Sequence, residues 1–122
     1  MKLEVGMYCY NKTNRKLGIG KIISFPIKNN VNIRYKNDIE TTSIENVEAS
    51  HNILDLIEPM DLLYIDISPD NCGGIVVPRI PETYCELEQI KDNIKLGKYI
   101  LIGVITKELL NENIFEVGGS NE

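Results

Sequence analysis

The sequence predicts a mostly β protein with one or two short helices, on three observations. β-branched residues, above all Ile, dominate the apolar side chains, and such residues favour strands. Gly, Asn and Asp recur at short intervals, which is typical of tight turns between strands. Residues 31–35 (VNIRY) alternate between apolar and polar, which puts Asn32 and Arg34 on the wet face of a half-buried strand.

Residues 1–55 are predicted to form a basic N-terminal module of short antiparallel strands. Gly18 and Gly20 indicate a tight bend or a close backbone approach within the second strand. Residues 43–47 could form one helical turn before the last strand. The expected strands are 6–10, 17–25, 31–35, 39–42 and a short one that ends near Ser50. This spacing favours a small curled barrel of the Tudor or KOW type.

Residues 56–122 are predicted to form an acidic β module that packs with the first, so that two small half-barrels make one compact domain. Pro78 and Pro81 confine the segment that contains them to a sheet edge or an irregular path. The expected strands are 60–67, 74–77, 99–105 and a closing strand 113–117. A strand at an exposed edge, such as 31–35 or 113–117, could pair symmetrically in a homodimer.

Two segments of the second module are candidates for helices. Thr106 is predicted to cap a short helix over 107–110, because its hydroxyl can accept a hydrogen bond from an otherwise unpaired backbone N–H. Residues 83–96 contain Leu87, Ile90 and Ile94 at helical spacing, yet they also fit a strand followed by a turn. The sequence leaves both structures open for this segment.

Charge is distributed unevenly along the chain. The 122 residues include 13 Lys and Arg against 18 Asp and Glu, a formal net charge of −5. Residues 1–36 hold eight basic residues and one acid, a net +7, whereas the remaining residues carry −12. Asymmetry of this kind bears on the choice of partner rather than on the fold.

The acidic part predicts a protein with a basic surface as the partner, because an acidic surface repels nucleic acid and can mimic its phosphates. The residues proposed to make this contact are Asp61, Asp66, Asp70, Glu86 and Glu88.

The basic part supports an alternative, a module that binds a nucleotide or a nucleic acid. Cations interleaved with aromatic residues are what phosphate contact and base stacking require. The residues proposed for this role are Tyr10, Arg15, Lys16, Lys21, Arg34 and Tyr35.

Groups for catalysis and metal binding are few. The chain has one histidine, His51, and its neighbours Ser50 and Asp55 cannot be expected to converge with it on one reacting atom. Three scattered cysteines form no CxxC pair and no zinc spacing, so we expect reduced, inert thiols. We therefore expect no catalytic residue, no metal and no cofactor. Residues 99–106 are the longest nearly uncharged apolar stretch, too short to span a membrane, and a cytoplasmic protein is expected.

Three stretches resemble a family of small uncharacterised proteins encoded by phages and prophages of low-GC Gram-positive bacteria. They are residues 46–63, with the core HNILDLIE, residues 102–119 (IGVITKELLNENIFEVGG), and the opening VGMY followed by LGIGKI at 17–22. Where the relatives commonly carry Gly-Asp, this chain has Pro59-Met60-Asp61. The resemblance implies an accessory protein that acts inside a bacterium, in a class where inhibitors of host immunity, such as inhibitors of CRISPR effectors, are frequent. It also implies that the partner with a basic surface is a host protein, inhibited when a functional surface is occupied. It implies no catalytic residues.

Overall fold

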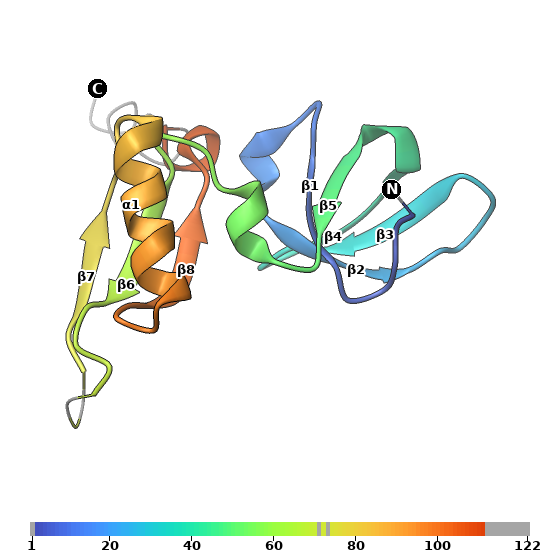
Figure 1. The fold of residues 1–122 in the computed structure, drawn as a ribbon. Helices are drawn as coiled ribbons and strands as arrows, with labels where there is room; N and C mark the ends of the chain where they lie inside the picture. Colours follow the sequence, from blue (N-terminus) through green and yellow to red (C-terminus); the bar gives the residue numbers. More distant parts are fainter. Residues whose placement is uncertain (1, 71, 73, 112–122) are drawn as a thin grey trace. The chain divides into compact units, whose positions relative to one another are not determined.

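A computed structural model describes residues 2–70, 72 and 74–111 of the chain (Figure 1). The chain divides into two compact units, Met1–Leu56 and Ile57–Glu122, and each is described by itself below. The boundary expected from the sequence was placed one residue earlier. The predicted mostly β class is confirmed, since both units are built on antiparallel sheets.

The first unit is a five-stranded antiparallel sheet in the order β4-β3-β2-β1-β5. Its strands are β1 (Tyr8–Asn11), β2 (Gly20–Ser24), β3 (Asn30–Arg34), β4 (Ile39–Ser43) and β5 (Val47–Ser50). The first four strands follow one another as a meander, and β5 returns to pair with β1. The described strands leave β4 and β5 as the two edges, so hydrogen bonds do not close this sheet into a barrel.

The first unit contains three single-turn 3-10 helices: η1 (Arg15–Leu17) between β1 and β2, η2 (Ile44–Asn46) between β4 and β5, and η3 (Ile53–Leu56) after β5. The turn η2 confirms the helical turn predicted for residues 43–47, and the Ser43 side chain caps it by accepting a hydrogen bond from the Glu45 N–H. Gly20 confirms the predicted close approach, because an added Cβ would lie 2.5 Å from the Arg34 carbonyl oxygen.

Alternation along the strands builds the core of the first unit. The prediction that residues 31–35 have one buried and one solvent-facing side is confirmed, because Val31 and Ile33 are fully buried and Arg34 is exposed. The core residues are Met7, Cys9, Ile22, Val31, Ile33, Tyr35, Val47 and Ala49. The prediction that strand 31–35 lies at an edge is wrong, because β3 pairs with β2 on one side and β4 on the other. Edge pairing in a homodimer therefore cannot use it.

The second unit is a three-stranded antiparallel sheet in the order β7-β6-β8, with a helix against one of its faces (Figure 1). Its elements are β6 (Leu62–Asp66), β7 (Val76–Arg79), α1 (Tyr84–Lys95) and β8 (Ile100–Ile105). Pro78 lies in β7, an edge strand, where its missing N–H breaks no ladder between strands. The segment 83–96 is a helix, so the described part of this unit is a sheet covered by a helix and departs from the expected half-barrel.

Thr106 begins the helical turn that was predicted after β8. Its Oγ1 accepts a hydrogen bond from the Leu109 N–H at 3.3 Å, and its carbonyl oxygen accepts one from the Leu110 N–H at 2.9 Å. The helix runs over residues 107–111, up to the end of the described part of the chain. The predicted N-cap is therefore confirmed. The strand predicted over 113–117 lies outside the described residues.

Candidate functional site

The five acidic residues proposed as a partner surface do not lie on one surface. Asp61 is fully buried, and its two carboxylate oxygens accept hydrogen bonds from the backbone N–H groups of Glu58 and Lys107, each at 2.9 Å. Asp61 thus ties the segment before β6 to the helical turn after β8. The prediction that it contacts a partner is wrong, because a fully buried carboxylate is not accessible.

Asp66 shapes the hairpin between β6 and β7. Its Oδ1 accepts hydrogen bonds from the N–H groups of Ser68 and Ile75 at 2.9 and 3.0 Å. Gly74 has a φ of +59°, and an added Cβ there would lie 2.4 Å from the Asp66 carboxylate. Asp66 is half-buried and serves this turn, whereas Asp70, in the same hairpin, is exposed.

Glu86 and Glu88 lie apart from these residues, on α1, and both are exposed. Glu86 accepts a hydrogen bond from the Glu82 N–H at 3.0 Å, and the Glu88 carboxylate lies 3.8 Å from Lys91 Nζ. The helix α1 covers one face of the sheet (Figure 1), whereas Asp66 and Asp70 belong to the hairpin between β6 and β7. The acidic residues of the helix and those of the hairpin therefore come from different elements. The acidic surface predicted from the sequence is therefore only partly assembled.

The register of the second sheet defines an apolar face that sequence reasoning missed. Pro78 on β7 and Gly103 on β8 lie opposite Tyr64, while Val76 and Ile100 lie opposite Asp66. Alternation along β8 adds Ile102, next to the register shift in the β6–β8 pairing. We call the side chains of Tyr64, Val76, Pro78, Ile100 and Ile102 the open face.

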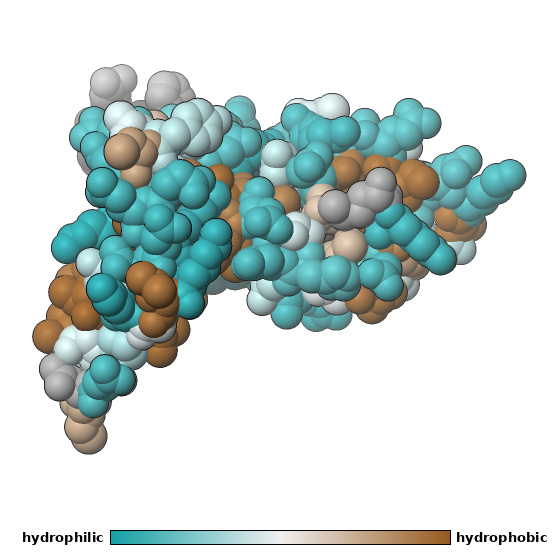
Figure 2. Space-filling model, in the orientation of Figure 1, coloured by the Kyte–Doolittle hydropathy of each residue, from teal (hydrophilic) through white to brown (hydrophobic). Residues whose placement is uncertain are grey.

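The open face is exposed although it is apolar. The exposed fractions are 38% for Tyr64, 53% for Val76, 49% for Ile100 and 57% for Ile102. The opposite face holds Leu63 and Ile65, which are fully buried, as is Leu87 of α1. Within the described part of the chain, α1 therefore covers one side of the sheet and no element covers these apolar residues. The side that α1 presents to solvent is mostly hydrophilic (Figure 2).

A signal for this face was present in the sequence. Residues 100–105 (ILIGVI) are apolar without interruption, whereas a strand with one solvated face normally alternates. Such a run indicates that both faces are apolar. Knowing that only one of them is covered required the position of α1.

The basic residues proposed for an anionic ligand occupy different places in the first unit. Lys21 on β2 lies directly opposite Tyr8 on β1 and Arg34 on β3, so the three side chains share the outer face of the sheet. Lys21 Nζ is 4.8 Å from the centre of the Tyr8 ring. The Arg15 guanidinium lies 4.6 Å from the centre of the Tyr10 ring and donates to the Leu56 carbonyl oxygen at 3.2 Å. Lys16 is exposed in η1.

Tyr35 is not available to a ligand. It is 6% exposed and belongs to the core, where burial raises the pKa of its hydroxyl, with smaller contributions from the nearby Glu40 and Cys9. The prediction that Tyr35 stacks on a base is wrong, because the alternation of β3 directs its ring inward.

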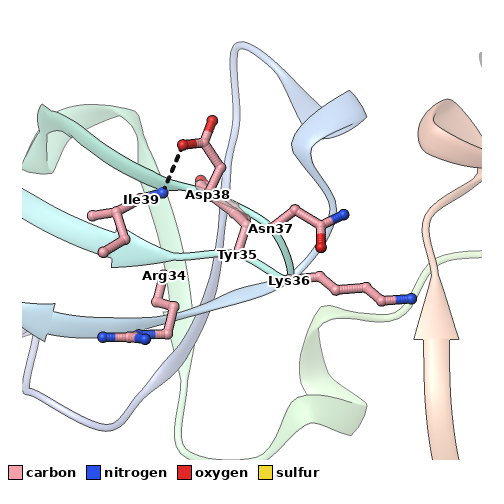
Figure 3. A pocket seen from close by; sticks show the side chains of 6 residues that line it. All are labelled: Arg34, Tyr35, Lys36, Asn37, Asp38 and Ile39. Atoms are coloured by element: carbon pink, nitrogen blue, oxygen red, sulfur yellow. Dashed lines mark hydrogen bonds between the residues drawn. The ribbon is translucent and has the colours of Figure 1, made fainter.

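A shallow depression of about 450 Å³ lies at the turn between β3 and β4 and is lined by residues 34–39. Figure 3 shows that Arg34, Lys36 and Asp38 point in different directions around this turn. The Asp38 carboxylate accepts a hydrogen bond from the Ile39 N–H at 2.9 Å (Figure 3). The polar groups that line the depression therefore do not converge on one point, as an acid, a base and a nucleophile acting together would.

The Ser/His/Asp letters near residue 50 do not form a triad. Ser50 Oγ donates directly to Asp55 at 2.6 Å, and His51 Nε2 lies 2.8 Å from Glu4 Oε1. His51 therefore makes no nucleophile–base pair with Ser50 in this arrangement. The described residues include no group of three His, Cys, Asp or Glu side chains placed to hold a metal ion.

The three cysteines differ in exposure. Cys9 is fully buried in the first core, and burial raises the pKa of its thiol to about 12. Cys72 and Cys85 are exposed. All three are unpaired by disulfides.

Comparisons with known proteins find no matching family model, curated protein or solved structure. Among the described helices, none is long and apolar enough to cross a membrane. The geometry of the two sheets is therefore what supports a function for this chain.

Proposed function

We propose that this chain is a non-catalytic binding protein whose second unit uses the open face to bind a protein. In the setting that the family resemblance implies, it is a phage or prophage accessory protein that acts in the host cytoplasm. Its target is a host factor, such as a CRISPR effector or another defence protein, which it inhibits by occupying a functional surface. The observation that carries the proposal is the exposed apolar open face.

Exposed apolar surface is concentrated in the second unit. Of the fourteen large apolar side chains that are exposed among the described residues, nine belong to this unit. Single exposed apolar residues are ordinary, whereas a contiguous patch marks an interaction surface. Tyr64 and its aliphatic neighbours share one sheet face, so they can be desolvated together by one partner. A few buried residues, with Tyr among the commonest, supply most of the binding energy in protein interfaces.

The net charge of the second unit indicates the charge expected on the partner around the apolar contact. Residues 57–122 contain five basic and twelve acidic residues, a net −7. Asp66 lies at one end of the open face, opposite Val76 and Ile100, and Asp70 follows in the same hairpin. A partner with basic residues around an apolar centre would be complementary. Such rim charges act mainly on association rate and specificity.

The test is a comparative capture from lysate of a low-GC Gram-positive bacterium, followed by affinity measurements with the purified partner. Ile102→Glu places a charge on the open face, at its β8 side, and is expected to weaken binding by at least about tenfold. The matched control is Tyr84→Glu, which also changes an exposed large apolar residue of the second unit, since Tyr84 is 71% exposed and lies on α1. A partner that binds both variants as tightly as the wild type would overturn the proposal.

The acidic contribution is tested separately by charge reversal at Asp70, Glu86 and Glu88, the exposed members of the predicted acidic set. With the same purified partner, Asp70→Lys is expected to slow association several-fold. Glu86→Lys and Glu88→Lys, on α1, are expected to do less. Larger effects at Glu86 and Glu88 than at Asp70 would move the binding surface to the helix.

A further inference from the structure

We propose that the outer face of β2, β3 and β4 in the first unit binds single-stranded nucleic acid, independently of the protein partner of the second unit. The residues of this basic face are Lys21, Ser24, Asn32, Arg34 and Thr41, with Tyr8 beside them on β1.

The first observation is an uncompensated pair of cations. Lys21 and Arg34 are directly opposite each other on neighbouring strands and both are exposed. Like charges in this position destabilise a sheet. Among the residues that the structure describes, neither side chain has an acidic partner within ion-pair distance. A bound anion would relieve the repulsion between them.

The rest of the basic face is neutral and able to form hydrogen bonds. Asn32 Nδ2 donates to Ser24 Oγ at 3.0 Å, and Asn32 Oδ1 accepts a hydrogen bond from Thr41 Oγ1. The described outer side chains of β2, β3 and β4 include no carboxylate. Glu40 is on the inner side of β4, opposite Ile33, where it accepts a hydrogen bond from Asn11 at 3.1 Å. No acid on these three strands therefore opposes the approach of a phosphate. On β5, the outer side carries Glu48, which lies opposite Tyr10 rather than Tyr8.

Tyr8 supplies the aromatic group that distinguishes a single strand from other polyanions. Its side chain is half-buried, and Lys21 Nζ lies 4.8 Å from the centre of its ring. Because this ammonium group lies over the ring, a base that stacks on Tyr8 would take its place, and Lys21 would then contact the adjoining phosphate. Unpaired bases can stack on an aromatic residue of a sheet face, whereas bases within a duplex are stacked on one another. The described elements of this face are strands, so it presents no helix for insertion into a major groove.

The experiment measures fluorescence anisotropy of a short labelled oligothymidylate with the full chain, and of a duplex of the same length, between about 50 and 200 mM salt. Two phosphate contacts predict a slope of about −1.4 in log affinity against log salt, or about a sevenfold loss across this range. The single strand is expected to bind more tightly than the duplex. Equal or tighter duplex binding, or no binding to the single strand, would overturn the proposal.

Variants separate a defined face from general attraction to a basic unit. Lys21→Gln and Arg34→Gln are each expected to remove about half of the salt slope. Lys28→Gln is the charge-matched control, because Lys28 is exposed in the turn between β2 and β3. Tyr8→Phe should retain the wild-type affinity, and Tyr8→Ala should lose about tenfold. Equal effects of Lys28→Gln and Arg34→Gln, or no effect of Tyr8→Ala in a protein that still unfolds cooperatively, would contradict the assignment.

Discussion

At the scale of single residues, the core of the first unit contains two ionisable groups that burial keeps neutral. Burial raises the pKa of Cys9 from 9.0 to about 12, and it also raises the pKa of Tyr35 above its usual value of 10.0. For both groups the proton is held more tightly in the folded chain than in the unfolded chain. Their contribution to stability is therefore complete below about pH 9 and is lost as the pH rises toward the folded values.

We expect the free energy of unfolding to decrease between about pH 9 and pH 12, by at most about 1.4 kcal/mol per pH unit for each of the two groups. Urea unfolding at a series of pH values measures this directly. Cys9→Ala should make the decrease shallower, because one of the two groups is gone. An identical pH profile for the wild type and this variant would show that Cys9 ionises in the folded chain as it does in the unfolded chain.

The hydroxyl of Tyr35 is buried, and it has no hydrogen-bond partner among the described residues. A buried polar group without a partner costs stability. Tyr35→Phe is thus expected to leave the free energy of unfolding unchanged or to raise it by about 1 kcal/mol. A decrease of that size in urea unfolding would mean that the hydroxyl has a partner in solution.

Asp61 is the opposite case, a buried carboxylate with backbone partners on two segments. Asp61→Asn replaces one acceptor oxygen by an amide donor, so one of the N–H groups of Glu58 and Lys107 loses its partner. We expect a loss of about 2–3 kcal/mol in the free energy of unfolding. Asp70→Asn, at an exposed position, should change it by no more than about 0.5 kcal/mol. Similar small effects for both variants would contradict the structural role of Asp61.

At the scale of elements, α1 shows which signals the sequence contained. Thr83 Oγ1 accepts a hydrogen bond from the Glu86 N–H at 3.1 Å, while the Glu86 carboxylate accepts from the Glu82 N–H. A Thr followed three positions later by Glu is the sequence pattern of a capping box. Together with the spacing of Leu87, Ile90 and Ile94, it would have favoured a helix over a strand and a turn.

The cap gives a test of this element. Thr83→Ala removes the acceptor for the Glu86 N–H and should lower the free energy of unfolding by about 1 kcal/mol. Thr83→Ser keeps a hydroxyl at the same position and should retain most of that stability. If urea unfolding gives the same loss for both, the side chain acts through packing rather than through the cap.

Strand positions were predictable because alternation and turn residues are local properties of the sequence. The pairing order was not, since it depends on which strands meet. Tyr35 and Asp61 illustrate the difference, since both carry groups suited to binding. Only the fold shows that the Tyr35 side chain lies in the core and that the Asp61 carboxylate is buried and accepts a hydrogen bond from the backbone N–H of Lys107. The open face required two facts together, the register of β6 with its neighbours and the side that α1 covers.

At the scale of the whole molecule, the charge asymmetry between the two folded units is smaller than the asymmetry along the sequence. The +7 of residues 1–36 is reduced to +2 over residues 1–56, because five of the six acids of the first unit follow residue 36. The second unit keeps −7. The cations of the basic face are thus set apart by strand register rather than by an overall excess of positive charge.

The central claim is that a protein partner covers the open face of the second unit. Hydrogen–deuterium exchange of the chain, alone and with the captured partner, tests it most directly. We predict that the partner slows exchange in peptides that contain β6, β7 and β8, with no comparable change in α1 or in the first unit. Slower exchange confined to α1, or to the strands of the first unit, would contradict the claim.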